Sequence, residues 1–464
     1  MSASLGQYLP ELAAIDPIVQ DNLLVTKFEH ALFPELIYRN DARRSQWRAN
    51  KGDDQIFTRE SNLEPIEDPL KSGDEPGTQE VKYEQWSVKA DQYADSVEVD
   101  MAVSRTAIQS TFVSKMENLG KQAGQSLNRK VRSKIFCAYT GGDTVAKTPG
   151  AATVSLHVES INGFEMVRHP QTGKLVNASP AFPKAINIGG FGPAEVISAV
   201  PDFPSIPLGP GVLTLAAPAN WAADAKITAD DRPPIIRAGL GLTGTVDNLT
   251  TTSGLSLAEI RTATALLRRN SVPRHSDGYY HVHCDPMAVS QIYADNEWQR
   301  LNEATPENAK YKEFIVGTLL KCRFFDNNES PNVHNTAAFA TGRGAATTSV
   351  RMGMPMRNKA GVSIIRTLVT GANSIFEEWI NEAEYGSEAG YTGKVGKFDV
   401  TRNGIVVNTV GVRMVIRAPL DKLQQKVAIS WSFSGDWGMP TDFGGGQTQA
   451  GFKRCMVIES GHTD

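Results

Sequence analysis

The chain has 464 residues, of which 21% are charged, and a formal net charge of −4. Such a weak negative charge provides no overall electrostatic basis for binding nucleic acid or an anionic membrane, so any charge-driven contact must arise from a local cluster. A chain of this length favours roughly two to four structural units, each able to bury a core.

The cysteines and the N-terminal segment both predict a soluble intracellular protein. The four cysteines are scattered and form no CxxC pair, which favours a reducing compartment over a disulfide framework. The N-terminal segment has no basic flank followed by an apolar core, and no window approaches about 18 consecutive apolar residues. We therefore expect neither a secretory signal nor a transmembrane helix.

Residues 17–47 have the spacing of one or two short amphipathic helices, interrupted near Pro34. An arm of this kind can bury its apolar face only against a partner surface. It ends in a basic cluster of four arginines: Arg39, Arg43, Arg44 and Arg48. Two interpretations remain for this cluster, a solvated helix end or a contact for an acidic partner.

Residues 53–84 are acidic, with ten aspartates and glutamates against three lysines and arginines. Prolines and glycines interrupt the segment, so it cannot form a core of its own. The β-prone pieces at residues 54–58 and 81–88 predict the two arms of an extended hairpin. A two-stranded excursion is marginal in isolation, and a disordered acidic linker is the alternative interpretation.

Residues 100–140 predict one long α-helix, because apolar residues recur at three- and four-residue steps and no proline interrupts them. A helix of about 35 residues would span about 50 Å, which is more than a compact domain usually accommodates. Gly141 and Gly142 follow as a C-terminal stop. The apolar stripe consists of Ile108, Phe112, Met116, Leu119, Ala123, Leu127, Val131 and Ile135.

The same helix is basic, with seven lysines and arginines against Glu117 alone in residues 104–134. Four of these cations fall away from the apolar stripe: Lys115, Lys121, Arg129 and Arg132. Part of the excess is favourable placement near the helix C-terminus, where cations meet the negative end of the helix dipole. Nonspecific contact with nucleic-acid phosphates is the second interpretation.

Residues 143–254 hold twelve of the 25 prolines and several short β-prone pieces, which together predict a compact β-rich insertion. Within it, residues 239–244 match the pattern GxGxxG. The residues that follow are poor helix formers, so the dinucleotide-binding fingerprint lacks the helix that it requires.

Helices and strands alternate from Ser256 onwards. Ser256 and Glu259 form a capping box at the start of a predicted helix through residue 270. A strand at residues 279–286, a helix at 287–301 and strands near 314–316 and 319–325 follow. Residues 332–361 predict a loop or a short edge hairpin, and residues 404–434 predict a long antiparallel hairpin.

One group of side chains has the composition of a metal site: His275, His281, His283 and Cys284. His281 and His283 are two residues apart and would point to the same side of a strand, which is compatible with zinc ligation. The sequence supplies no HExxH motif and no further paired histidine, so structural histidines beside a turn are the favoured interpretation. No GxSxG or GxxxxGK[ST] motif is present, and nothing argues for catalysis.

The order of these parts resembles that of a tailed-bacteriophage major capsid protein of the Hong Kong 97 type. Three segments carry further resemblance: EQWSVKADQYADSVEVDMAV at residues 84–103, DGYYHVHCDPMAVSQI at 277–292 and KEFIVGTLLKCRFFDNN at 312–328. The resemblance covers residues 20–140 and 253–458. It departs at residues 143–254, which are not part of the minimal fold.

The resemblance implies an α+β Hong Kong 97-like capsid fold with a β-rich insertion domain. Its parts would be an N-terminal arm (residues 1–50), an E-loop hairpin and peripheral strand (51–98), the spine helix of the peripheral domain (99–142), the insertion domain (143–254), the axial domain (255–403), and the returning peripheral β-hairpin with the C-terminus (404–464).

The resemblance also implies a structural protein, without enzymatic activity, cofactor or metal, that self-assembles into the icosahedral shell around the double-stranded DNA genome of a tailed phage. Its partners would be other copies of itself in hexamers and pentamers, a separate scaffolding protein, the portal, decoration proteins, and packaged DNA through nonspecific contacts. It would be assembled in the bacterial host cytoplasm and reside in the virion capsid. The alternative function is a metal-dependent hydrolase that uses His281 and His283.

In such a shell, the acidic and basic segments would have defined contacts. We expect four acidic side chains of the hairpin to face basic residues of a neighbouring subunit: Glu60, Glu64, Glu67 and Asp68. The arginines of the arm are candidates for that basic surface. Lys115, Lys121, Arg129 and Arg132 would instead face the lumen and the packaged DNA.

Overall fold

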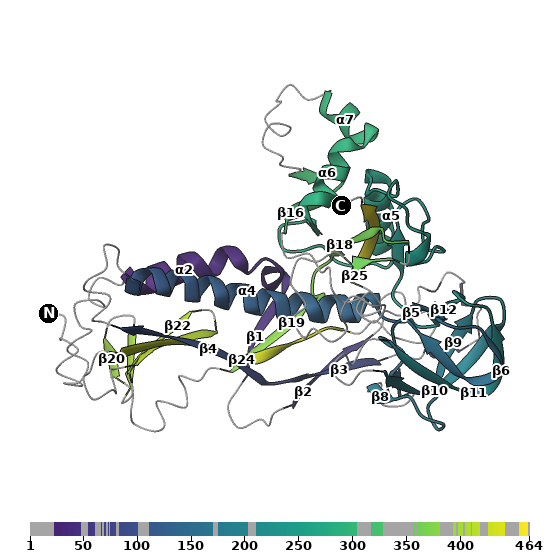
Figure 1. The fold of residues 1–464 in the computed structure, drawn as a ribbon, viewed down its shortest axis with the longest axis horizontal. Coiled ribbons are helices and arrows are strands. Elements are labelled where there is room, and N and C mark those ends of the chain that lie inside the picture. Colours follow the sequence, from purple (N-terminus) through teal and green to yellow (C-terminus); the bar gives the residue numbers. More distant parts are fainter. Residues whose placement is uncertain are drawn as a thin grey trace. The chain divides into compact units, whose positions relative to one another are not determined.

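The computed structural model shows a chain of mixed helices and strands, which confirms the predicted α+β class (Figure 1). It describes residues 23–47, 54–60, 66, 69–70, 73, 75–79, 83–100, 111–169, 175–202, 210–303, 317–327, 356–358, 360–380, 393–395, 398–401, 404–409, 411–417, 426–440 and 454–462. Two compact units are present: the first comprises residues 1–55, 87–131 and 375–438, and the second comprises residues 56–86, 132–374 and 439–464. None of the helices in the described ranges has the length and apolar character that a membrane span requires.

The long helix predicted from the sequence is confirmed as α4 (Thr111–Thr140), and most of its length belongs to the first unit. Its buried side chains follow the predicted stripe: Met116, Leu119, Ala123, Leu127, Val131 and Ile135. Residues 101–110, where the prediction began the helix, lie outside the described residues.

The arm of the first unit contains α2 (Leu23–Leu32) and two short 3-10 helices, η3 (Phe33–Glu35) and η4 (Tyr38–Asp41). α2 lies along α4 (Figure 1), and two glycines of α4 permit this close approach. A Cβ atom added at Gly120 would lie 2.8 Å from the carbonyl oxygen of Phe28. Tyr38 fixes the end of the arm, because its backbone N–H donates to Oδ1 of Asn128 at 2.9 Å.

Gly124 tests this contact directly. In an ordinary helix interior, alanine is more stable than glycine by about 1 kcal/mol. At position 124, however, the added Cβ would lie 2.8 Å from the carbonyl oxygen of Leu32 and the Cβ of Glu35, so α2 must shift. We expect Gly124→Ala to destabilise the protein by about 1–3 kcal/mol in thermal unfolding. Asn118→Ala, at an exposed position of the same helix, is the control and should cost nothing; equal stability of the two variants would exclude the tight contact.

An eight-stranded sheet completes the first unit. Its strands are β1 (Arg43–Trp47), β4 (Asp91–Asp100), β19 (Phe376–Ile380), β20 (Gly393–Val395), β21 (Phe398–Thr401), β22 (Gly404–Thr409), β23 (Val412–Arg417) and β24 (Lys426–Gly438). β24 is its central strand and pairs with β4, β19 and β23. The predicted hairpin at residues 404–434 is therefore wrong in detail: three antiparallel strands occupy it, because Gly411 turns the chain at φ +80° between β22 and β23.

β2 (Asp54–Glu60) and β3 (Tyr83–Lys89), whose residues 56–60 and 83–86 belong to the second unit, form a separate two-stranded sheet at the position of the predicted hairpin. Phe57 of β2 stacks on Trp86 of β3 with ring centroids 5.7 Å apart. The side chain of Gln85 donates to Oγ1 of Thr58 at 3.2 Å. These cross-strand contacts set the register of the two strands.

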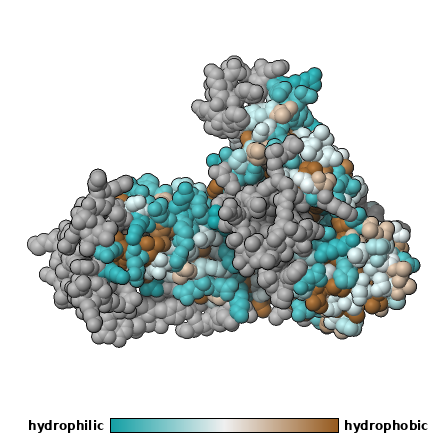
Figure 2. All heavy atoms as spheres, in the orientation of Figure 1, coloured by the Kyte–Doolittle hydropathy of each residue, from teal (hydrophilic) through white to brown (hydrophobic). Residues whose placement is uncertain are grey.

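A six-stranded sheet accounts for most of the predicted β-rich insertion. Its strands are β5 (Asp143–Val145), β6 (Gly150–Val158), β9 (Lys184–Ile188), β10 (Gly192–Pro201), β11 (Gly211–Trp221) and β12 (Lys226–Ala229); β7 (Met166–Arg168) pairs with β8 (Leu175–Asn177) apart from it. Leu156, Ile186 and Leu213 belong to its buried core. On the face shown in Figure 2, hydrophobic residues lie in small groups among polar ones.

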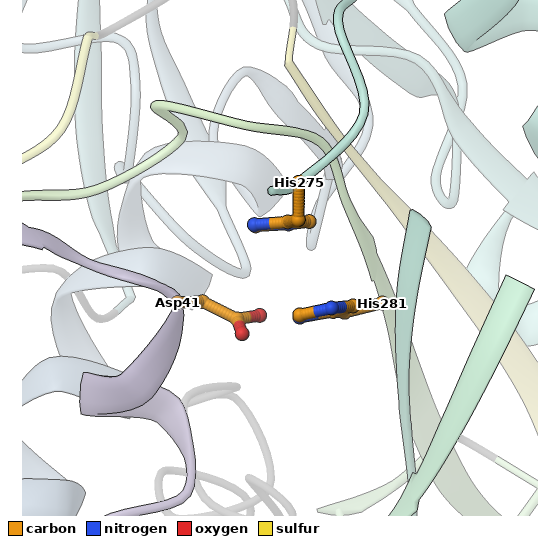
Figure 3. A group of neighbouring side chains, drawn as sticks. All are labelled: Asp41, His275 and His281. Atoms are coloured by element: carbon orange, nitrogen blue, oxygen red, sulfur yellow. The ribbon is translucent and has the colours of Figure 1, made fainter. Parts of the chain in front are cut away.

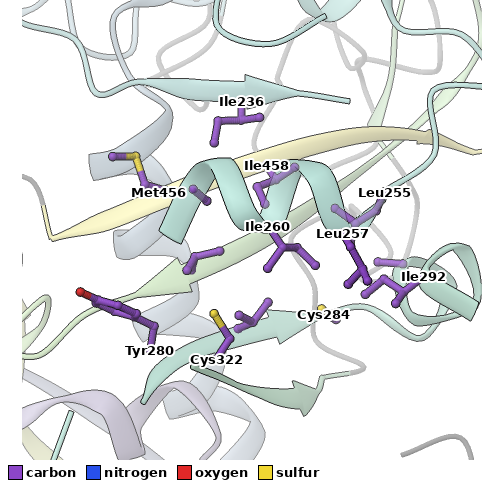
Figure 4. Packing of buried hydrophobic residues seen from close by; sticks show 14 of the residues in the cluster. Ile236, Leu255, Leu257, Ile260, Tyr280, Cys284, Ile292, Cys322, Met456 and Ile458 are labelled. Atoms are coloured by element: carbon purple, nitrogen blue, oxygen red, sulfur yellow. The ribbon is translucent and has the colours of Figure 1, made fainter. Parts of the chain in front are cut away.

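A seven-stranded sheet with three α-helices forms the rest of the second unit. Its strands are β13 (Ile235–Arg237), β14 (Tyr280–Cys284), β15 (Thr318–Leu319), β16 (Cys322–Asp326), β17 (Met356–Arg357), β18 (Ser363–Thr370) and β25 (Cys455–His462). The helices are α5 (Leu257–Arg269), α6 (Pro286–Ala294) and α7 (Asn296–Glu303), and η5 (Val246–Asn248) precedes them. Ile260 of α5 packs with Ile236 and Ile458 of the sheet (Figure 4).

Three details of this region differ from the sequence prediction. β13 lies inside the segment predicted as the insertion, yet it pairs in parallel with β25. β25 lies in the range that the sequence assigns together with the returning hairpin (404–464), but it pairs with β18 across eight residues. The single helix predicted at residues 287–301 is two helices, because Asp295 is extended and its carboxylate accepts from the backbone N–H of Glu297 at 3.0 Å.

The capping box predicted for α5 is confirmed. The backbone N–H of Ser256 donates to Oε2 of Glu259 at 3.0 Å, and the backbone N–H of Ala258 donates to the Ser256 hydroxyl at 3.3 Å. This reciprocal pairing satisfies N–H groups that the first turn of a helix leaves without internal partners.

Candidate functional site

The predicted histidine pair lies on β14, and the two rings share one side of the strand. His281 and His283 both contact the ring of Phe325, with centroids 4.9 Å and 5.3 Å away respectively. His275 stacks in parallel on His281 with ring centroids 3.9 Å apart (Figure 3). Nε2 of His281 is hydrogen-bonded to the carboxylate of Asp277 at 2.9 Å. Nε2 of His275 is hydrogen-bonded to the Thr370 hydroxyl at 3.1 Å.

Of the four predicted ligands, the structure brings His275 and His281 together, whereas His283 and Cys284 do not join them. Neither His283 nor Cys284 belongs to any group of three candidate ligand atoms in the described ranges. His283 is 2% exposed against Phe325, and burial raises the pKa of the Cys284 thiol, which disfavours the thiolate that binds metals. The favoured interpretation, structural histidines beside a turn, agrees with this packing.

The structure describes one of the four predicted acidic residues of the hairpin. Glu60 ends β2 with an exposed side chain. Glu64, Glu67 and Asp68 lie outside the described residues. Exposed apolar side chains accompany the acidic ones: Ile56, Ile66 and Leu70 are 48%, 74% and 61% exposed.

The four arginines of the arm have different environments. Arg39 is fully buried, and its Nε and Nη2 bind the two carboxylate oxygens of Glu377 at 2.7 Å and 2.5 Å. Its charge is thus matched within the chain, and it cannot serve as part of an exposed basic surface. Arg43 and Arg44 are exposed, whereas Arg48 lies outside the described residues.

The four cations of α4 are also engaged unequally. Lys115 donates to the carbonyl oxygen of Glu98 at 2.8 Å, and Lys121, with a side chain 60% exposed, lies 4.0 Å from Glu35. Arg129 is half-buried. Arg132 is only 6% exposed, so the prediction that it faces solvent is wrong. Asn128 and Phe136, four residues before and after it on the same helix face, are also buried, which explains the burial of Arg132.

Sequence patterns did not reveal one buried charge cluster of the second unit. Arg237 on β13 donates through Nε to Glu459 at 3.0 Å and through Nη1 to Asp143 at 3.1 Å. Arg366 on β18 binds the other oxygen of Glu459 at 3.0 Å. Asp143 begins β5, so a continuous set of buried charges joins the six-stranded and seven-stranded sheets. The partners are more than 90 residues apart along the chain, and no local pattern could have paired them.

The GxGxxG segment is held by the same cluster. Arg237 donates to the carbonyl oxygen of Gly244 at 2.6 Å, and Lys226 donates to those of Thr243 and Gly244 at 3.0 Å and 2.7 Å. Only the three-residue η5 follows. A phosphate-binding loop presents backbone N–H groups at the start of a helix, whereas this loop has its backbone carbonyl groups bound by Arg237 and Lys226.

Comparisons with known proteins gave matches at the level of structure only. No protein-family model matches the chain, and no curated protein matches it. The capsid structure of cyanophage P-SCSP1u is similar at 10% identity and a TM-score of 0.45, covering 92% of this chain and 89% of that chain. The cyanophage Pam1 capsid is similar at 9% identity and a TM-score of 0.48, with coverages of 89% and 86%. The capsid of Ralstonia phage GP4 is similar at 12% identity and a TM-score of 0.45, with coverages of 91% and 88%.

Proposed function

We propose that this chain is a major capsid protein, which self-assembles into the icosahedral shell around the double-stranded DNA genome of a tailed phage. The observation that carries the proposal is the hairpin. A two-stranded sheet is marginal alone, yet this one exposes Ile56, and Ile66 and Leu70 are exposed on the acidic segment between its strands. Exposed apolar side chains on an acidic segment favour a protein partner, because their burial stabilises association.

The partner is another copy of the same chain. Arg43 and Arg44 are exposed, while Arg39 and Arg132 are buried and leave the set of candidate contact residues. Complementary charges set the register and the rate of encounter, and buried apolar area supplies most of the association free energy. Lys115, Lys121 and Arg129 remain candidates for nonspecific contact with packaged DNA.

Further partners follow from the same function: hexamers and pentamers of the chain, a separate scaffolding protein, a portal and decoration proteins. Assembly would take place in the host cytoplasm. Electron microscopy of the purified protein tests the function in one measurement. Closed particles of many copies are expected, whereas a small oligomer holding stoichiometric zinc would favour the hydrolase and contradict the proposal.

Reversing the acidic charges of the hairpin tests the inter-subunit role of the hairpin. We expect the variant Glu60→Lys, Glu64→Lys, Glu67→Lys, Asp68→Lys to form far fewer closed particles while the unassembled protein stays soluble, because attraction to a basic neighbour becomes repulsion. Sedimentation separates particles from free subunits. Glu195→Lys with Asp230→Lys, exposed positions of the six-stranded sheet region, controls for added positive charge. Particle yield equal to wild type in the hairpin variant would refute this role.

A further inference from the structure

One end of the α5 region is strongly basic. Between Ile260 and Ser276 the chain contains four arginines and no acidic residue. Arg268 and Arg269 stand in the last turn of α5, and both side chains are exposed. Cations in this position are favourable near a helix C-terminus, which by itself accounts for these two.

Tyr280 at the start of β14 gathers further cations at the same end. Its hydroxyl donates to the carbonyl oxygen of Val272, three residues after α5, at 2.9 Å. Its backbone N–H donates to the carbonyl oxygen of Lys321, in the turn between β15 and β16, at 3.0 Å. The guanidinium of Arg274 lies 5.9 Å from the centre of its ring. Helix dipole placement does not explain Arg274 or Lys321, because neither belongs to α5.

An apolar side chain accompanies these cations. Leu320 and Lys321 form the turn between β15 and β16, and both have left-handed backbone conformations, with φ of 53° and 60°. Leu320 is 39% exposed, and Lys321 is exposed beside it. We call the set Arg268, Arg269, Arg274, Leu320 and Lys321 the basic end.

The cations of the basic end are unmatched within the described ranges. No acidic side chain there forms an ion pair with Arg268, Arg269 or Lys321. Neighbouring cations differ: Arg261, also on α5, pairs with Glu297 at 2.9 Å, and Arg323 lies 3.5 Å from Asp277. Four cations and an exposed leucine thus lie on segments that Tyr280 joins, and this set of side chains suits an acidic segment that also carries apolar side chains.

We propose that the basic end binds the acidic hairpin of a second copy of this chain. The inference rests on the proposed shell function and names the surface that receives the hairpin. Residues 53–84 hold ten acidic against three basic residues, and Ile66 and Leu70 of that segment are exposed. Opposite charges steer the two surfaces together, and contact of Leu320 with an apolar side chain of the hairpin excludes water. DNA is the other acidic candidate, but the phosphate backbone that nonspecific binding contacts offers no apolar group to match Leu320.

The test uses the full chain and measures the lowest protein concentration at which closed particles appear, by light scattering and electron microscopy. We expect Arg268→Glu with Arg269→Glu to raise this concentration about tenfold. Arg261→Glu is the matched control on the same helix, because Arg261 is already paired, and it should change the value little. Arg268→Gln with Arg269→Gln removes the two charges without reversing them and should raise the assembly concentration by an intermediate amount. This milder change keeps the test valid if the reversed variant does not fold.

Charge exchange identifies the partner. The variant Glu60→Arg with Glu75→Arg changes two exposed hairpin positions and should by itself impair assembly. Combining it with Arg268→Glu and Arg269→Glu should restore assembly. Normal assembly of the reversed basic end would overturn the proposal, and so would a loss that the exchange does not rescue. Normal particles that retain less DNA would assign the basic end to the genome and also overturn it. If the wild type forms no particles, the proposed function itself fails, which is a distinguishable result.

Discussion

Replacing Arg237 with methionine should destabilise the second unit by about 3–5 kcal/mol, the usual result of removing one partner from a buried ion pair. Arg237 is 1% exposed and binds Glu459, Asp143 and the carbonyl oxygen of Gly244. Methionine matches the length of the side chain but leaves two carboxylates without this cation. Urea unfolding followed by tryptophan fluorescence should show an earlier transition.

Arg261→Met provides the comparison for this variant. Arg261 forms an ion pair with Glu297, but both side chains are about half exposed, at 58% and 46%. Exposed pairs contribute at most about 1 kcal/mol, because water and salt screen them. Equal shifts in the two variants would mean that the buried cluster does not support the fold.

The pH dependence of unfolding tests the same buried cluster in a second way. Burial alone would raise the pKa of Glu459, but Arg237 and Arg366 outweigh it and lower the pKa below its ordinary value. The pKa of Glu459 is therefore lower in the folded than in the unfolded state. The stabilisation that ionised Glu459 contributes is present above the unfolded pKa and is lost as the pH falls through the folded pKa. In Arg237→Met, the acid-dependent loss of stability should be smaller.

Arg39→Met should have a comparable effect on the first unit, again about 3–5 kcal/mol. Both carboxylate oxygens of Glu377 bind Arg39, and the indole N–H of Trp437 donates to one of them at 3.0 Å. The guanidinium also lies 5.1 Å from the centre of the Phe433 ring. Removing the cation leaves Glu377 buried at 0% exposure without its main counter-charge.

The consequence should be local as well as global, because Arg39 belongs to η4 of the arm while Glu377 and Phe433 belong to the eight-stranded sheet. Limited proteolysis should cut the arm faster in Arg39→Met than in wild type. Arg44→Met, at an exposed position five residues further along, is the control and should resemble wild type. Unchanged proteolysis and stability in Arg39→Met would show that the pair does not hold the arm.

Periodicity predicted the long helix well, because its buried residues recur at the spacing of one helix face. The capping box at Ser256 was equally readable, since its partners lie three residues apart. Strand partners were less accessible. β13 has only three residues and contains no alternation, so nothing in its sequence indicates pairing with a strand more than 200 residues later.

The exposure of charged residues is the property that the sequence predicted least and that the tertiary structure determined. Arg39 and Arg44 belong to the same basic cluster, yet one is buried on a carboxylate and the other faces solvent. The amino-acid sequence by itself determined the mixed helix and strand class, the long amphipathic helix, and the opposite charges of the hairpin and of the helices, because each depends on neighbouring residues. Only the tertiary structure decided which cations are neutralised within the chain, since their partners approach through folding of distant segments into sheets.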